Sequence, residues 1–263
     1  MVPAAVGYQC PECLEDARRE YRRGAGSLRR RARSLTATRA LLAAIIVMFV
    51  IEIGASPAAT LFRGPPGTVL YDLGASWPPA IASGEFWRLF SAMFLHANLF
   101  HILFNGYALW IFGQAVEEEY GTPWMVVLFF LTGFLASVTS YAFGDIDALG
   151  VGASGAIFGI FGAFVAYNYR RRHLALASAR LRSAMTLIVL NALLAFAFRS
   201  FIDWRAHLGG LIAGFVAGYV VEGFGRRDTR WVVRAVGIVA LIAVGVALVA
   251  WRTDQIRAVL GAA

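Results

Sequence analysis

Four residues within apolar stretches of this chain carry side chains suited to nucleophilic or acid–base chemistry: Ser154, His207, His101 and Asn105. A serine hydroxyl becomes a nucleophile when a neighbouring base such as an imidazole removes its proton. His101 and Asn105 are four residues apart, so that on a helix both side chains project from one face. Because a histidine inside a membrane is costly, it marks a functional site by default. These four residues are the first candidates for an active site.

Membrane helices are the elements that must position these side chains. The 263 residues are 59% hydrophobic and 15% charged, with a mean hydropathy of +0.64. That composition is too apolar for a soluble domain. Most of the apolar stretches approach the ~20 residues that a bilayer requires. They cover roughly residues 40–53, 98–116, 123–143, 154–169, 183–201, 204–223 and 231–251. We therefore expect an all-α polytopic membrane protein with about seven helices.

The charges predict how the chain crosses the membrane. The net charge of +8 does not indicate a nucleic-acid partner, because the arginines stand in short runs between apolar stretches. Such runs follow the fourth and sixth stretches and fill residues 1–38, which places these alternate segments in the cytosol. We expect a cytosolic N-terminus and an external C-terminus, which a reporter fused to either end would test. All 24 basic residues are Arg, a bias typical of GC-rich bacterial genomes.

The fourth apolar stretch is short, and this predicts where Ser154 lies. From Ser154 to the arginines at 170–172 the helix would measure about 24 Å at ~1.5 Å per residue, less than the ~30 Å hydrocarbon core. Residues 144–152 before it form helix poorly and must descend into the membrane. Irregular backbone at that depth is tolerated where it is buried in protein or lines a wet cavity. We expect Ser154 at the floor of such a cavity, at a helix N-terminus whose free N–H groups can bind an oxyanion.

A lone serine in a membrane helix more often eases helix packing than reacts. The other three candidates change that balance, because His207, His101 and Asn105 also fall near the predicted external ends of their stretches. Four polar or reactive side chains would then meet at one depth. Gly210 and Gly214, with Gly218, repeat every four residues along the sixth stretch. Small residues at this spacing let helix backbones approach closely, which would bring His207 to Ser154.

These motifs resemble those of the rhomboid family of intramembrane serine proteases. The resemblance covers about residues 85–222 and rests on Trp87-Arg88, His101-x-x-x-Asn105, Gly152-Ala153-Ser154-Gly155 and Ala206-His207-x-Gly209-Gly210. It implies a six-helix core in which Ser154 is the nucleophile and His207 its base, without an acid. It also implies that the side chains of His101 and Asn105 and the backbone N–H of Ser154 bind the oxyanion. The implied substrates are transmembrane segments of other membrane proteins.

The resemblance also frames the rest of the chain. Phe158 lies one turn after Ser154 on the same helix face and can pack against the His207 ring; where some family members carry Tyr, Phe keeps the stacking surface and loses the hydroxyl. We expect a cytosolic arm over residues 1–38, a catalytic core over 39–223, and a cytosolic loop, a seventh helix and a short external tail over 224–263. We expect structural roles for His96, which lies off the face of His101, and for Glu117.

Cys10 and Cys13 form a C-x-x-C pair in the N-terminal arm. Tetrahedral zinc needs four ligands, and the arm offers no His and no further Cys. The pair is similar to half of a small zinc-binding segment that precedes some bacterial rhomboids. An idle pair, a zinc ion shared by two chains and self-association through this pair all stay open. We expect no other metal and no cofactor.

Other functions fit the sequence less well. A catalytically inactive rhomboid-like protein that binds membrane clients would be expected to lack the serine or the histidine, and both are present. A membrane metalloprotease needs H-E-x-x-H, which is absent from the sequence. A transporter is often built from inverted repeats, and the sequence shows none.

Overall fold

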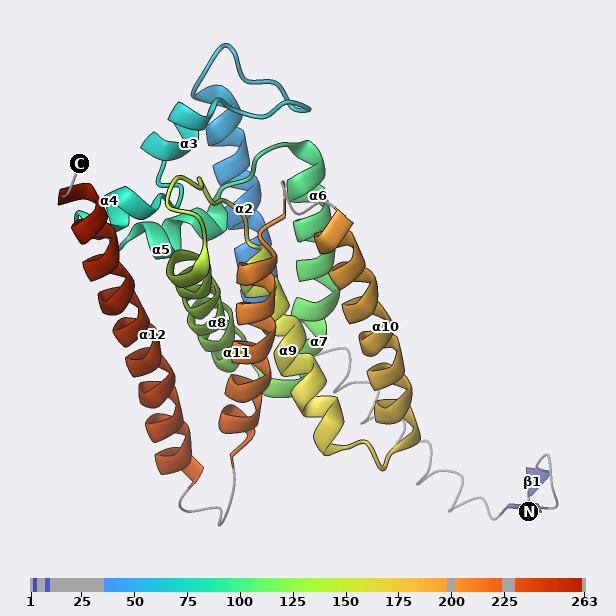
Figure 1. Ribbon diagram of the computed structural model, residues 1–263. Coiled ribbons are helices and arrows are strands. Elements are labelled where there is room, and N and C mark those ends of the chain that lie inside the picture. The colour runs from blue at the N-terminus through green and yellow to red at the C-terminus, as the bar shows by residue number, and fades with distance from the viewer. Residues whose placement is uncertain (1, 4–7, 10–35, 198–201, 224–229, 262–263) are drawn as a thin grey trace. The chain divides into compact units, whose positions relative to one another are not determined.

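The computed structural model describes residues 2–3, 8–9, 36–197, 202–223 and 230–261 (Figure 1). The chain divides into two compact units, Met1–Thr36 and Ala37–Ala263. In the described part of the first unit, the two-residue strands β1 (Val2–Pro3) and β2 (Tyr8–Gln9) pair antiparallel. Cys10 and Cys13 lie outside the described residues, so the zinc hypothesis stays a prediction.

The second unit is built of helices, which confirms the all-α membrane architecture with a six-helix core and a seventh, C-terminal helix. Five of the described helices are long and apolar enough to cross a membrane. The second membrane segment is one continuous path of α6, a π-helical turn η2 and α7. The main helices are α2 (Thr36–Gly54), α6 (Leu99–Ala108), η2 (Leu109–Gly113), α7 (Gln114–Tyr120), α8 (Thr122–Phe143), α9 (Ser154–Arg170), α10 (Ala175–Ala197), α11 (Trp204–Glu222) and α12 (Arg230–Gly261).

Two helices extend well beyond the apolar stretches that predicted them. Helix α10 begins at Ala175 rather than near residue 183, and its first turns carry Arg180, which pairs with Glu119 of α7 at 3.0 Å. Helix α12 continues to Gly261 rather than ending near residue 251. In both cases the added turns contain polar side chains whose partners lie on other elements. A hydropathy pattern does not register such partners.

Helix α9 occupies the centre of the second unit (Figure 1), where α8, α10, α11 and the α6–α7 path all contact it. Its contact with α11 is made backbone to backbone through glycines. A Cβ placed on Gly214 would collide with the carbonyl group of Gly159, and one on Gly210 would collide with the carbonyl oxygen of Gly155. The glycine stripe of the sixth apolar stretch therefore faces α9.

The segment between α2 and α6 folds into short helices around one buried arginine. These are α3 (Gly67–Asp72), α4 (Pro78–Ala82), α5 (Arg88–Ser91) and the 3₁₀ turn η1 (Ala92–Phe94). The Arg88 guanidinium donates to the carbonyl oxygens of Tyr71 at 2.6 Å and Ala75 at 3.1 Å and pairs with Glu85 at 2.8 Å. A single side chain thus holds three parts of this segment together.

Glu117 of α7 fastens the opposite end of the helix bundle. Its buried carboxylate accepts hydrogen bonds from the backbone N–H groups of Ala37 and Thr38 at 3.0 and 2.9 Å. It also accepts from the hydroxyls of Thr38 and Thr122 at 2.6 and 2.7 Å. These bonds join the starts of α2 and α8 to α7, so Glu117 has the structural role expected for it.

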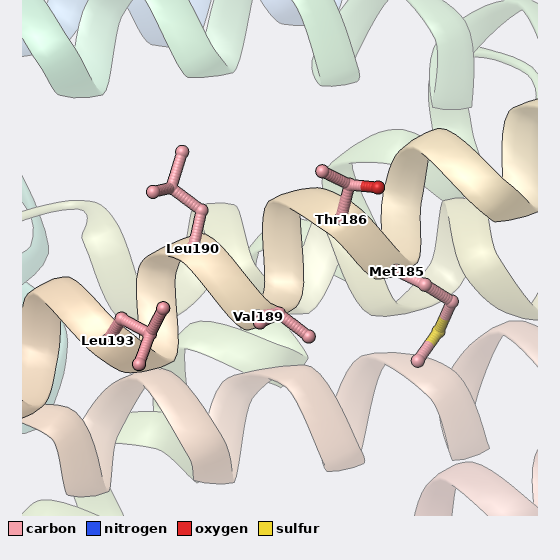
Figure 2. Close-up of a pocket in the computed structure, with 5 residues that line it drawn as sticks. All are labelled: Met185, Thr186, Val189, Leu190 and Leu193. Carbon is pink, nitrogen blue, oxygen red and sulfur yellow. The ribbon is translucent and has the colours of Figure 1, made fainter.

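Helix α10 is the least covered helix of the core. Its first half buries Ala177 and Ala184, whereas Leu187, Leu193 and Leu194 in its second half are exposed. A pocket of about 430 Å³ lies along this second half, lined by Met185, Thr186, Val189, Leu190 and Leu193, whose side chains Figure 2 shows projecting from the helix. None of these lining residues is among the predicted site residues.

We predict that Gly214→Ala destabilises the protein, because its methyl group has no room beside the Gly159 carbonyl group. Overpacking of this kind costs about 1–3 kcal/mol of unfolding free energy. Thermal melting in detergent would measure the loss. Gly54→Ala is the matched control, since a Cβ at Gly54 meets no heavy atom within 4 Å. Equal melting temperatures for the two variants would contradict the packing argument.

Candidate active site

Ser154 is the first residue of α9, and the ten residues before it form an irregular loop that is held by backbone hydrogen bonds. Residues 144–153 contain no helix or strand. Gly150 exchanges two backbone hydrogen bonds with Ser76, at 2.9 and 2.8 Å, and the Gly152 N–H donates to the Ala92 carbonyl at 2.9 Å. The first helical hydrogen bond of α9 runs from the Ile157 N–H to the Ala153 carbonyl. The preceding N–H groups, including that of Ser154, are therefore left without acceptors in the helix.

Gly152 brings this loop against two polar side chains of α6. Its φ of +126° lies in the left-handed region that favours glycine. A Cβ at this position would stand 2.6 Å from His101 Nε2 and 3.6 Å from Asn105 Nδ2. Any larger residue would push these side chains away. The structure thus brings His101, Asn105 and Gly152 together directly before Ser154.

His101 and Asn105 present hydrogen-bond donors at this place. The Ala97 N–H donates to His101 Nδ1 at 3.4 Å, which assigns the proton of the neutral ring to Nε2, the nitrogen facing Gly152. Asn105 is buried, and its Nδ2 has no hydrogen-bond partner among the described residues. Buried polar groups are almost always paired, so an unpaired one needs an explanation. An acceptor supplied by a substrate would satisfy both donors.

His207 lies against the same end of α9. Its ring stacks on Phe158, with ring centroids 4.3 Å apart and an interplanar angle of 15°. Phe158 follows Ser154 by one turn and shares its face. A Cβ on Gly155 would lie 3.7 Å from Ala206 Cβ. Gly155 follows Ser154 and Ala206 precedes His207, so the neighbours of the two candidate residues contact each other. No hydrogen bond joins Ser154 to His207 within the described part of the chain, and such bonds are often long before a substrate binds.

Asp203, which was not among the residues predicted from the sequence, fixes the turn that carries His207. It caps α11: one carboxylate oxygen accepts from the N–H groups of Arg205 and Ala206, each at 3.1 Å, and the other accepts from the Ser140 hydroxyl of α8. The His207 N–H donates to the Asp203 carbonyl at 3.2 Å. An Asp directly before an apolar helix is a recognisable N-cap signal, but its bond to Ser140 depends on the fold.

Glu52 of α2 was also missed, and it supports His101 indirectly. Both of its buried carboxylate oxygens accept from the His96 backbone N–H, at 3.2 and 3.0 Å. The His96 ring donates from Nδ1 to the Phe94 carbonyl at 3.2 Å and packs edge-on against the His101 ring, 5.1 Å between centroids. His96 therefore has the structural role expected for it. A single acidic residue inside an apolar stretch was the available signal.

Comparison with known proteins places this helical membrane protein in a family. The rhomboid domain matches residues 83–224, more than half of the chain, and the chain belongs to the rhomboid family. It is 35% identical over 175 residues to rhomboid protease GluP of Bacillus subtilis, covering 66% of this chain and 32% of that protein. It is 33% identical over 199 residues to rhomboid-like protease 2 of Toxoplasma gondii, covering 72% and 67%.

A third relative, RHOMBOID-like protein 6, mitochondrial, of Arabidopsis thaliana, is 33% identical over 167 residues, covering 61% of this chain and 52% of that protein. The chain therefore spans only about a third of GluP and about half of the Arabidopsis relative. Two of these three relatives bear the name protease.

We predict that Asp203→Ala loosens the start of α11. Removing an N-cap side chain typically costs about 0.5–2 kcal/mol of unfolding free energy. Thermal melting of the purified protein would record the loss, with Asp147→Ala, an exposed residue of the loop before Ser154, as control. Asp203→Asn retains a capping oxygen and should lose less than Asp203→Ala. An unchanged melting temperature in Asp203→Ala would show that this cap does not stabilise the turn that carries His207.

Proposed function

We propose that this chain is an intramembrane serine endopeptidase that hydrolyses peptide bonds in or near transmembrane segments of other membrane proteins. Two observations support the proposal: the His207 ring stacks on Phe158, one turn after Ser154, and His101 and Asn105 lie beside Gly152, two residues before Ser154. We assign the catalytic core to residues 39–223.

In the proposed reaction, His207 takes the proton of Ser154 Oγ as this oxygen attacks a peptide carbonyl carbon. The tetrahedral intermediate collapses when the C–N bond breaks and the imidazolium of His207 gives its proton to the leaving amine. The product is an ester between the substrate carbonyl and Ser154. A water molecule, deprotonated by His207, then attacks this ester. The bond between the carbonyl carbon and Ser154 Oγ then breaks, the His207 imidazolium returns its proton to Oγ, and the carboxylic acid product leaves.

The negative charge that develops on the carbonyl oxygen needs donors that are already in place. The Nε2–H of His101, the Nδ2–H of Asn105 and the backbone N–H of Ser154 are the proposed set. Asn105 Nδ2 has no partner among the described residues, which supports this role, because such a donor breaks no existing protein hydrogen bond when it binds the oxyanion. The close fit of Gly152 against His101 explains why the loop needs glycine at this position.

In a Ser-His-Asp triad the acid orients the histidine ring. Here Phe158 supplies part of that orientation for His207. Its ring lies nearly parallel to that of His207 at 4.3 Å, which restricts rotation of the imidazole. Asp203 adds a second restraint through the backbone of the same turn. With these two contacts, a dyad of Ser154 and His207 does not require a carboxylate bonded to the ring.

The alternative is a catalytically inactive protein that binds membrane clients through the same fold. The one feature in its favour is the lack of a direct hydrogen bond between Ser154 and His207 in the described structure. The presence of both Ser154 and His207 favours the enzyme, as does Asn105 Nδ2, which has no partner among the described residues. The following variants separate the two functions.

We predict that Ser154→Ala and His207→Ala each abolish cleavage of a single-span model substrate in proteoliposomes, because neither retains a nucleophile with its base. Labelling of the parent protein by a fluorophosphonate probe should disappear in Ser154→Ala. The matched controls are Ser137→Ala on α8 and His173→Ala, an exposed residue between α9 and α10. Full cleavage by a folded Ser154→Ala protein would overturn the proposed function.

For the oxyanion site we predict a graded loss. Removing one such donor typically lowers kcat about 10²–10³-fold, and the remaining donors should soften this for Asn105→Ala, which keeps measurable activity. The combined variant His101→Ala/Asn105→Ala should show none. Asn191→Ala on α10, whose side chain bonds only within its own helix in the described structure, is the control. Parent-like kcat in the combined variant would exclude both side chains from the mechanism.

A further inference from the structure

Helix α12 lies beyond the residues that match the rhomboid domain, and its second half makes specific polar contacts with the core. Three polar side chains of this second half reach other elements. Arg252 donates from Nη2 to the Gly144 carbonyl oxygen at 3.0 Å, Thr253 shares a buried hydrogen bond with the Tyr141 hydroxyl at 2.9 Å, and Arg257 donates from Nε to the Ala82 carbonyl oxygen at 2.8 Å.

Apolar packing reinforces these bonds. Ile256 and Val249 are buried in a cluster with Ile81, Leu89 and Val138, which come from three different parts of the core. Gly245 gives close access to α8, because a Cβ there would lie 2.6 Å from the Phe134 ring. Most of the remaining surface of α12 is exposed, as expected for a lipid-facing helix. The first half of α12 also touches the core, where Arg234 donates from Nε to the Val221 carbonyl oxygen at 2.6 Å, but the buried residues of α12 all lie from Gly245 onward.

The carbonyl groups bound by Arg252 and Arg257 both belong to segments that hold the loop before Ser154. Gly144 is the C-cap of α8, and the loop of residues 144–153 begins there and ends at the nucleophile. Near its C-terminal end, that loop forms backbone hydrogen bonds with Ser76 and Ala92. Both belong to the segment that also contains α4, whose last residue is Ala82. Arg252 thus holds the beginning of the loop, and Arg257 holds the segment against which its end is fixed.

We propose that the C-terminal half of α12 is a clamp that positions the nucleophile loop, with Arg252, Thr253 and Arg257 as positioning residues for Ser154. This inference rests on the proposed function, since it assigns Ser154 the chemistry. The clamp touches neither the proposed dyad nor the donors on α6. It acts by holding the loop so that the Ser154 hydroxyl and the N–H groups at the start of α9 keep their places beside His207, His101 and Asn105.

The expected effect is on the chemical step. A displacement of ~1 Å at reacting groups can cost ~10²-fold in rate. We expect Arg252→Gln/Arg257→Gln to lower kcat at least about tenfold with KM changed less than about twofold, and to slow fluorophosphonate labelling of Ser154 in parallel. Single variants Arg252→Gln and Thr253→Val should show smaller losses of the same kind. Arg252→Lys, which keeps a donor, should recover part of the rate.

The experiment uses the full chain in proteoliposomes, with kcat, KM and probe labelling measured below the melting transition of each variant. Arg230→Gln, at the opposite and exposed end of α12, and Val259→Thr, on its exposed surface, are the matched controls. Parent-like kcat and labelling in the folded double variant would overturn the clamp, and so would a loss of melting temperature alone. If the double variant does not fold, the two single variants decide by the same criteria.

Ser154→Ala measured in parallel separates this inference from the proposed function. If Ser154→Ala still cleaves the substrate, the proposed function fails and the clamp fails with it. If Ser154→Ala is inactive and the clamp variants match the parent, the clamp alone is wrong. Reduced kcat in the clamp variants, with an inactive Ser154→Ala and unchanged controls, supports both.

Discussion

The contact between α9 and α11 is the constraint on which the rest of the structure depends. It is made at Gly159 and Gly214, and at Gly155 and Gly210, where no side chain fits between the two backbones. In a bilayer the helices gain little from hydrophobic burial, because lipid is as apolar as their side chains, so close packing must supply the attraction. This contact fixes the start of α11 beside the start of α9, and with it the positions of His207 and Phe158.

Around this contact, buried polar side chains bind backbone groups far away in the sequence. Glu117 accepts from the start of α2, Glu52 accepts from His96, and Arg88 donates to two carbonyl groups. Lipid offers no hydrogen bonds, so irregular backbone within or beside the membrane requires such partners. Asn105 Nδ2 is one of several buried polar atoms without a partner among the described residues, and it lies beside Gly152 in the loop that leads to Ser154.

The sequence was sufficient for features that depend on local patterns. Apolar stretches predicted the membrane helices, the short fourth stretch predicted that a helix begins at Ser154, and the spacing of Gly210 and Gly214 predicted close packing of that helix. The roles of Asp203 and Glu52, and the true ends of α10 and α12, could not be predicted in the same way. Each depends on a partner more than forty residues distant, such as Ser140 for Asp203 or Gly144 for Arg252. Hydropathy describes each side chain alone and carries no information about its distant partners.

The irregular loop before Ser154 shows why a helix outside the matched domain can matter for the site. The chain before Ser154 is not helical, so its carbonyl groups require donors from elsewhere in the protein. The core supplies donors for part of the loop, through Ser76 at Gly150. The Gly144 carbonyl is bound instead by Arg252 of α12. The same helix also binds the Ala82 carbonyl. In the proposed clamp, α12 therefore stabilises both the start of the loop at Gly144 and the segment against which the end of the loop is fixed.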